Sequence, residues 1–145
     1  MMHLVRGATA VVVAAACLTW FTAGDAQAQD PRASSVQKTA RDWLALTDRG
    51  DAQASWRAAG KKFQDAMPTE GWAKALNEVR PPLGNIVDRA ALSTEFSNSF
   101  QGVPDGEYAL LIFRSSFANK ADSRETVTLE READGSWRVI GYFIR

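Results

Sequence analysis

Two arginines flank a rigid turn near the middle of the chain, at a spacing that suits an anion clamp. Arg80 precedes the sequence Pro81-Pro82-Leu83-Gly84, and Arg89 follows it on a predicted strand. Guanidinium groups bind a carboxylate or a phosphate through paired hydrogen bonds. The alternative is structural, because the helix dipole favours a cation near a helix C-terminus, and both arginines would then bond backbone carbonyls and nearby acids. Arg80, Arg89 and the adjacent Asp88 are the candidate ligand-binding residues.

A second set of polar residues could serve acid–base chemistry. Asp88 alternates with Ile86 and Ala90 on one strand face, so its carboxylate could point into a partly apolar cavity, where desolvation raises the pKa of a carboxyl group. An aspartate on a strand face is more often solvated or paired with an arginine. The other candidates are Glu95, Glu107, Tyr108 and Tyr142. No pair among them has a recognisable catalytic spacing, so no catalytic residue is assigned.

The N-terminus has the pattern of an export signal. Arg6 precedes a nearly apolar run over residues 8–21, which is shorter than the roughly 20 residues that span a membrane. Ala26-Gln27-Ala28 then supplies the small residues of a signal peptidase site. We therefore expect residues 1–28 to be a signal peptide cleaved near Ala28, which places the protein in the periplasm or outside the cell. The alternatives are an uncleaved anchor helix, an ordinary buried helix and a lipoprotein attached at Cys17.

Cys17 and His3 are the only cysteine and histidine, and both lie in the predicted signal peptide. The mature chain would contain neither. This composition excludes disulfides, cysteine nucleophiles, Ser-His-Asp chemistry and metal sites built on sulfur or imidazole. No group of Asp and Glu has a metal-ligand spacing either, so we expect no cofactor and no transition metal.

Charge is balanced in the mature chain. Without Arg6 and Asp25, the 17 basic and 17 acidic residues fall to 16 of each. Such a surface has no long-range field that would attract nucleic acid or an anionic membrane. The expected partners are a small molecule or another protein, with no nucleic acid and no membrane after signal cleavage.

The elements that must position these residues begin with helices. Residues 29–35 are expected to form a flexible tether, and residues 36–145 a single domain. A first helix is predicted after Ser34 or Ser35, ending at Gly50, with the apolar positions Val36, Ala40, Trp43, Leu44 and Thr47. Asp51 should cap a second helix that ends near Ala59, and a looser segment around Phe63 and Met67 follows.

A third helix should begin at Thr69 and stop at Pro81-Pro82, because proline disrupts the helical hydrogen-bond pattern. Its predicted apolar face contains Trp72, Ala75, Leu76 and Val79. The tryptophans are interpreted as core residues rather than as an aromatic ligand cage.

After Gly84 the hydrophobic pattern has a period of two. Four strands are predicted, over Asn85–Phe96, Glu107–Phe117, Arg124–Glu132 and Trp137–Ile144, separated by short turns. Short turns favour an antiparallel meander. The sequence therefore predicts an α+β domain, with N-terminal helices packed on a curved four-stranded antiparallel sheet.

Both faces of the second and fourth strands are apolar, whereas the helices can cover only one face of the sheet. The expected uncovered face contains Tyr108, Leu110 and Ile112, continued by Ile140, Tyr142 and Ile144. We expect this face to form a homodimer or partner interface, with Tyr108, Leu110, Ile112 and Tyr142 as its candidate residues. The alternative is that the tether or strong sheet curvature covers it.

The chain also resembles the DUF4019 family of small exported bacterial proteins over most of the mature sequence. The resemblance rests on these residues: Trp43-Leu44, Asp48, Gly50, Ser55-Trp56, Phe63, Trp72, Arg80-Pro81-Pro82-Leu83-Gly84, Arg89, Asp134-Gly135-Ser136-Trp137-Arg138-Val139 and Gly141-Tyr142. It implies a cystatin-like or nuclear-transport-factor-like cone, in which a curved sheet wraps helices around a pocket. The family has no assigned activity to carry over.

These observations predict a non-catalytic exported domain that binds a small molecule or a protein partner. An acid–base enzyme that uses Asp, Glu or Tyr is one alternative. An assembly module that acts through the sheet face is the other.

Overall fold

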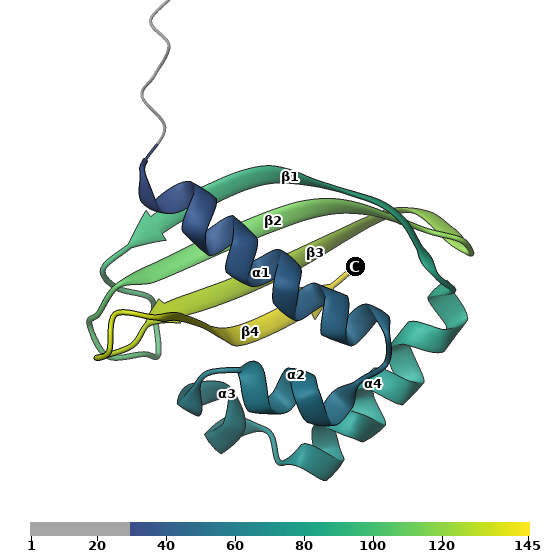
Figure 1. Ribbon diagram of the computed structural model, residues 1–145, viewed down its shortest axis with the longest axis horizontal. Coiled ribbons are helices and arrows are strands. Elements are labelled where there is room, and N and C mark those ends of the chain that lie inside the picture. Colours follow the sequence, from purple (N-terminus) through teal and green to yellow (C-terminus); the bar gives the residue numbers. More distant parts are fainter. Residues whose placement is uncertain (1–29) are drawn as a thin grey trace, which may run out of the picture.

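The computed structural model describes residues 30–145, which form four helices followed by four strands (Figure 1). The predicted signal peptide and Gln29 lie outside these residues. Among residues 30–145, no helix is both long and apolar enough to cross a membrane. The order of helices first and strands second is as the sequence predicted.

Helix α1 (Arg32–Asp48) lies across one face of the sheet (Figure 1). It begins earlier than predicted, so residues 32–35 are helical and do not belong to a tether. The reason is Asp30, whose carboxylate accepts a hydrogen bond from the amide of Arg32 at 2.9 Å and caps the helix in place of the serines. Pro31 adds a backbone angle (φ −60°) that already suits a helix start.

Two short helices and a longer one follow. Helix α2 (Ala52–Ala58) is capped as predicted by Asp51, whose carboxylate accepts from the amide of Ala54 at 2.9 Å. Helix α3 (Lys61–Ala66) occupies the segment predicted to be loose. Phe63 explains the difference, because its ring is buried against the rings of Trp43 and Trp72 and holds this turn on the core.

Helix α4 (Thr69–Leu83) continues through Pro81 and Pro82, so the predicted stop at the prolines is wrong. The carbonyls that lose an amide partner belong to Asn77 and Glu78, on the exposed side of α4, where water can bond them. Gly84 then turns the chain into the sheet with a φ of +75°, a conformation that favours glycine.

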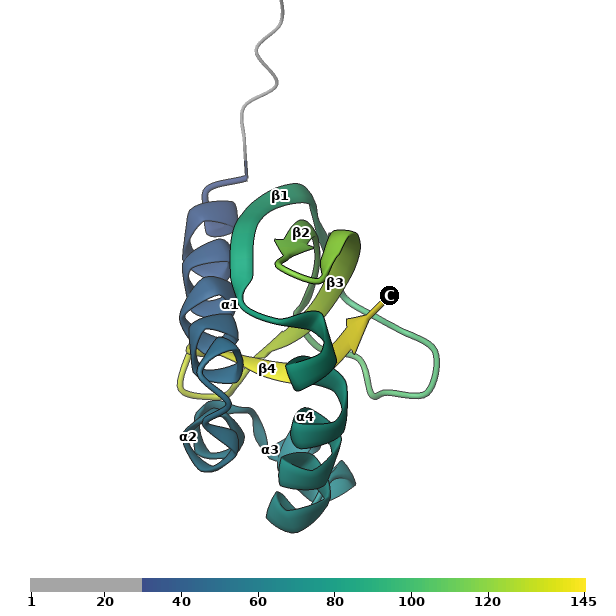
Figure 2. The ribbon, with the colours of Figure 1, turned by 90° about the vertical axis from the view of Figure 1, so that its right-hand side faces the viewer.

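The sheet is an antiparallel meander in the order β1-β2-β3-β4. Its strands are β1 (Ile86–Ser97), β2 (Tyr108–Phe117), β3 (Lys120–Arg131) and β4 (Trp137–Ile144), close to the predicted ranges. Figure 2 shows how strongly the sheet curves, with α1 along its concave side and α4 at one end. We call the concave side the inner face and the opposite side the outer face.

The core lies between the inner face and the helices. Leu111 and Phe113 of β2 are fully buried, as are Val127 and Leu129 of β3. The ring of Trp43 on α1 stacks on that of Trp72 on α4, with centroids 5.7 Å apart. Ser55 anchors both indoles, since Trp43 Nε1 donates to its carbonyl and Trp72 Nε1 to its hydroxyl. The interpretation of these two tryptophans as core residues is confirmed.

A register shift in β4 changes which side chains face the core. Leu129 pairs with Val139, but Thr128 pairs with Gly141, so the strand contains one extra residue at this point. After the bulge the alternation is reversed, and Tyr142 pairs with the buried Val127 on the inner face. The prediction that Ile140, Tyr142 and Ile144 share the face of Leu110 is therefore wrong for Tyr142 and Ile144.

Candidate functional site

Five side chains from five elements meet below the inner face, and we call them the buried charged cluster: Asp48 of α1, Arg80 of α4, Arg89 of β1, Glu125 of β3 and Tyr142 of β4. The Arg89 guanidinium is at the centre. Its two terminal nitrogens each donate to one oxygen of Asp48 at 2.8 Å. Its Nε donates to Glu125 Oε1 at 2.8 Å, so one guanidinium group bonds two carboxyl groups.

Arg80 closes the other side of the cluster. Its Nη2 donates to Asp48 Oδ1 at 2.6 Å and its Nη1 to the Thr47 hydroxyl at 3.1 Å. Its guanidinium carbon also lies 4.8 Å from the ring centroid of Phe117. The residue is only 7% exposed, which is rare for arginine without such partners.

Glu125 is completely buried, and both of its oxygens are bonded. Oε1 accepts from Arg89 and from the Ser115 hydroxyl, and Oε2 accepts from the Tyr142 hydroxyl. A buried carboxylate without such partners would be strongly destabilising. Two guanidinium groups and two carboxyl groups thus form a closed set of ion pairs, in which the buried Arg80 Nε has no hydrogen-bond partner among residues 30–145.

The cluster also fixes protonation states. Burial opposes ionisation of Asp48, but hydrogen bonds from Arg89 and Arg80 outweigh it and hold the pKa of this carboxyl below its ordinary value. Burial would lower the pKa of Arg89, yet Asp48 and Glu125 together raise it. Burial and the adjacent Glu125 charge raise the pKa of the Tyr142 hydroxyl. At neutral pH these three groups therefore keep a single protonation state.

An apolar pocket of about 260 Å³ lies next to the cluster, between α4 and the end of β4, and we call it the α4–β4 pocket. It is lined by Met67, Trp72, Ala75, Leu76, Val79, Arg80, Tyr142, Phe143 and Ile144. Val79 is 44% exposed and Phe143 is 53% exposed, although the sequence pattern predicted Val79 in the core. Arg80 and Tyr142 belong to both the pocket and the cluster.

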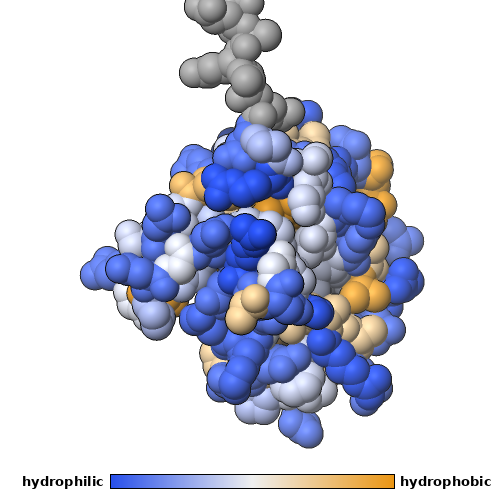
Figure 3. Space-filling model, turned by 60° about the vertical axis from the view of Figure 1, so that its left-hand side comes forward, coloured by the Kyte–Doolittle hydropathy of each residue, from blue (hydrophilic) through white to orange (hydrophobic). Residues whose placement is uncertain are grey.

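Exposed apolar side chains are otherwise sparse. The face in Figure 3 is largely hydrophilic, and its apolar areas are small and separate. Among residues 30–145, Val79, Val87, Leu92 and Phe143 are the large hydrophobic residues that are exposed. Two of these four lie on the α4–β4 pocket, which distinguishes it from the other hollows of the surface.

The structure brings together some of the predicted site residues. Arg80 and Arg89 meet on Asp48, so the carboxylate that this pair clamps belongs to the chain itself. Asp88 is exposed and pairs with Ser116 of β2, one position from Arg89 and therefore on the outer face. The expectation that the Asp88 carboxylate faces an apolar cavity is wrong, since strand alternation places the inner-facing position at Arg89.

The predicted interface residues do not all lie on one face of the sheet. Leu110 and Ile112 are half-buried on the outer face. Tyr108 shares this face but is only 1% exposed, because the loop after β1 covers it: its ring contacts Phe100, and its hydroxyl bonds the Pro104 carbonyl. Tyr142 lies on the inner face. A partner surface on the outer face would therefore contain Leu110 and Ile112 without the tyrosines.

Sequence reasoning missed Glu125 and gave no role to Asp48. The signal for Glu125 was its alternation with Val127 and Leu129, which places a glutamate at a core position of its strand. Asp48 follows the last turn of an apolar helix face, next to the buried Thr47. Neither pattern reveals that both residues reach the same arginine.

Comparison with known proteins shows the family to which this chain belongs. The model of the family described as protein of unknown function (DUF4019) matches residues 39–142. The chain belongs to the DUF4019 family. That range contains the whole buried charged cluster and all of the α4–β4 pocket lining except Phe143 and Ile144, and the resemblance expected from the sequence is confirmed. No curated protein matches the chain.

Three solved structures are similar to this DUF4019 chain. A protein from Catenulispora acidiphila superposes with a TM-score of 0.50 at 12% identity, covering 78% of this chain and 89% of the other. The ketosteroid isomerase-like protein from Erwinia carotovora atroseptica gives 0.46 at 16% identity, covering 80% and 96%. ActVI-ORFA from Streptomyces coelicolor gives 0.48 at 14% identity, covering 78% and 95%. Such identities show the fold alone, and the predicted α+β domain with N-terminal helices packed on a curved four-stranded antiparallel sheet is confirmed.

Proposed function

We propose that this DUF4019 domain binds a small apolar ligand in the α4–β4 pocket and catalyses no reaction on it. The observation that carries the proposal is an apolar, open pocket beside two polar side chains that are bonded into the cluster: the Arg80 terminal nitrogens donate to Thr47 and Asp48, and the Tyr142 hydroxyl donates to Glu125. The Arg80 Nε is buried and has no hydrogen-bond partner among residues 30–145. Val79 and Phe143 leave apolar surface in water beside the hollow, and a ligand would remove that surface from solvent.

Size supports a small ligand. Pockets for drug-sized molecules are usually about 300–1,000 Å³. At about 260 Å³ this pocket suits a short alkyl chain or a single ring. The aromatic floor formed by Trp72 and Tyr142 would contact such a group on one side, and Val79 on the other.

The protonation states favour binding over acid–base catalysis. A general acid or base works best when its pKa lies near the operating pH. The pKa of Asp48 is shifted below its ordinary value and that of Tyr142 above it, so both move away from neutrality. Both oxygens of Glu125 are bonded within the protein, which leaves none free to accept a substrate proton.

A titration with 1-hexanol tests the proposal. We expect the methyl NMR signals of Ala75, Val79 and Ile144 to shift and saturate, and those of Val87 on β1 to stay unchanged. Val79→Asp should abolish the shifts at Ala75 and Ile144, because it places a charge at the pocket mouth. Val87→Asp is the matched control, since Val87 is 69% exposed and lies outside the pocket. Equal binding by both variants, or no saturable shift, would refute the proposal.

We further propose that the chain acts in the periplasm or outside the cell after cleavage near Ala28. The support is the charged start, the short apolar run and the Ala26-Gln27-Ala28 site. The intact mass of the exported protein should correspond to a chain beginning near Gln29. A mass that retains residues before Ala26, or that includes a lipid on Cys17, would contradict it.

A further inference from the structure

Three arginines stand in one row across the outer face of the sheet. Arg114 of β2 pairs directly with Arg124 of β3. Arg124 in turn exchanges both backbone hydrogen bonds with Arg145, at 3.0 Å each, just after β4 ends. We call Arg114, Arg124 and Arg145 the arginine row.

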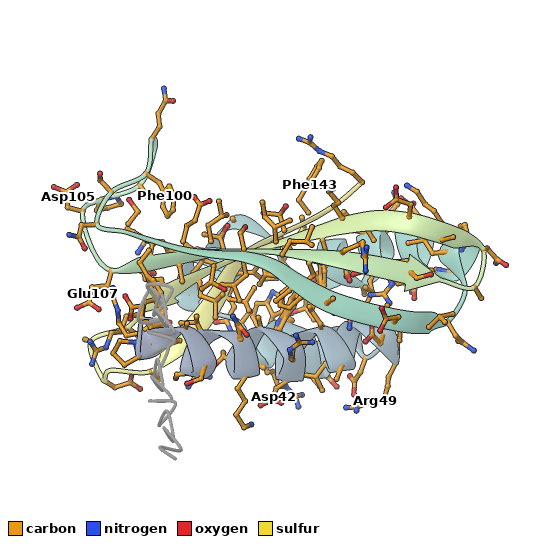
Figure 4. The ribbon with its side chains drawn as sticks, turned by 90° about the horizontal axis from the view of Figure 1, so that it is seen from above. Asp42, Arg49, Phe100, Asp105, Glu107 and Phe143 are labelled. Atoms are coloured by element: carbon orange, nitrogen blue, oxygen red, sulfur yellow. The ribbon has the colours of Figure 1, made fainter. Side chains whose placement is uncertain are left out.

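Alternation places all three side chains on the outer face. Arg114 and Arg124 lie one position from the buried, inner-facing Phe113 and Glu125. Arg145 lies two positions from Phe143, which Figure 4 shows projecting from the side of the sheet away from α1. The guanidinium carbon of Arg145 is 5.1 Å from the Phe143 ring centroid, as expected for neighbours on one face. All three arginines are exposed.

The row brings together three arginines that have no carboxylate partner. Within residues 30–145, none of the three has an acidic oxygen within 4.0 Å, as is also true of the exposed Arg41, Arg49 and Arg57, whereas Arg32, Arg80, Arg89, Arg131 and Arg138 each have at least one. Unlike those other three, the members of the row lie at paired positions on adjacent strands. Asp88 of β1 and Asp122 of β3 lie near the row along these strands, and neither forms an ion pair with it. Like charges directly opposite one another destabilise a sheet. An unfavourable local arrangement of this kind is typical of a functional site.

We propose that the arginine row is a binding site for a phosphate group. Paired strand positions bring side-chain origins to within about 4.5–5.5 Å, so adjacent guanidinium groups can reach one multivalent oxyanion together. Arginine suits this role, since its planar donor fork matches phosphate geometry. The anion would replace mutual repulsion with charge-assisted hydrogen bonds. This site is separate from the α4–β4 pocket and does not depend on the function proposed for it.

Inorganic phosphate is the first probe. We expect it to shift the Nε–Hε NMR signals of Arg114, Arg124 and Arg145 saturably, and to leave that of Arg57, an exposed arginine on α2, unchanged. Sodium chloride at equal ionic strength should produce no comparable shift. Equal shifts with chloride would overturn the proposal, because they would show only screening.

Variants of the row complete the test. Arg124→Gln should weaken phosphate binding at least about tenfold, the effect of losing one charge-assisted hydrogen bond. Without phosphate it should have an unchanged or higher midpoint of thermal unfolding, because repulsion is relieved. Arg57→Gln is the matched control and should bind phosphate like the unmodified protein. Should Arg124→Gln prove unstable, Arg114→Gln gives the same test at the neighbouring strand. Undiminished binding by a folded row variant would overturn the proposal.

Vesicles distinguish the source of the phosphate group. If the site takes lipid headgroups, the unmodified protein should sediment with phosphatidylglycerol vesicles and not with phosphatidylcholine vesicles, and Arg124→Gln should remain in solution. If it takes soluble phosphates, inorganic phosphate should bind while both vesicle types leave the protein in solution. Equal sedimentation of the protein and of Arg124→Gln would contradict a role for the row.

Discussion

The buried charged cluster and the α4–β4 pocket share Arg80 and Tyr142 but differ in every physical respect. In the cluster, charged groups lie out of water and bond one another. In the pocket, apolar side chains remain partly in water and have no partner of their own. The cluster therefore holds five elements in place. The pocket, which shares Arg80 and Tyr142 with the cluster, is the region that can bind a ligand. Variants that open the cluster should cost stability, whereas variants of the pocket should cost binding.

The largest expected effect follows from removing the central cation. Arg89→Met leaves the carboxylates of Asp48 and Glu125 buried without their shared partner, and we expect a loss of about 3–5 kcal/mol in the free energy of unfolding. Urea denaturation measures it. Arg57→Met on the exposed surface of α2 is the control and should change stability by less than about 0.5 kcal/mol. A loss below about 1 kcal/mol for Arg89→Met would show that the cluster is not closed as described.

Acid should weaken the same contacts. The pKa of Asp48 is lower in the folded chain than its unfolded value near 3.8, so its ionisation stabilises the fold at neutral pH and this contribution is lost as the pH falls below about 4. Asp48→Asn should cost about 1.5–3 kcal/mol at pH 7 and much less at pH 3. Urea denaturation at both pH values tests this. A difference that does not narrow in acid would contradict the assignment.

Substitution of Tyr142 tests how the cluster contributes to stability at high pH. Its folded pKa is raised, so the stabilisation from the neutral hydroxyl is present below the unfolded pKa of about 10 and decreases as the pH rises above it. Tyr142→Phe should cost about 1–3 kcal/mol at pH 7, because Glu125 Oε2 loses its donor. The variant should also lose less stability than the unmodified protein between pH 9 and pH 11. Parallel pH profiles would indicate that the hydroxyl is not shielded from solvent.

The sequence predicted the elements better than the cluster. Period-two alternation located four strands to within a few residues, because an antiparallel sheet with a buried face imposes that pattern directly. Asp30 was overlooked as a cap since Ser34 and Ser35 offered equally good chemistry about one helical turn closer to the apolar face. The bulge between Val139 and Gly141 could not be predicted, because one extra residue in a strand does not change the amino-acid composition in a recognisable way.

The cluster itself is a tertiary property. Arg80 and Arg89 could be selected as an anion clamp from their types and spacing, yet their partners lie 32 to 41 residues away along the chain. Pairing over such distances depends on how β1 and β3 curve toward the end of α1. The prediction of the sheet face on which Tyr142 lies was wrong for the same reason, because this face depends on the register shift in β4.

A smaller effect is expected on the outer face, where the partner interface stays a prediction. Leu110 is half-buried there, beside the covered Tyr108. Leu110→Glu should leave the domain folded, at a cost of about 1 kcal/mol, and should convert any dimer to a monomer. Sedimentation velocity at high concentration measures this. If the unmodified domain is already a monomer and no partner is recovered, the interface prediction is contradicted.

The central claim is that the charges of the cluster are paired with one another, so that the pocket binds apolar groups. The most direct test compares the affinities of three probes of equal length: 1-hexanol, hexanoate and hexylammonium. Competition NMR on the methyl signals of Val79 and Ile144 would measure all three in one protein sample. Hexanol should bind most tightly and each charged probe about tenfold or more weakly, because the Arg80 charge is paired with Asp48, the Tyr142 hydroxyl is bonded to Glu125, the Arg80 Nε is buried, and a charged head must stay in water. Tighter binding of hexanoate than of hexanol would contradict the account, since it would show that an arginine of the cluster is available to a ligand.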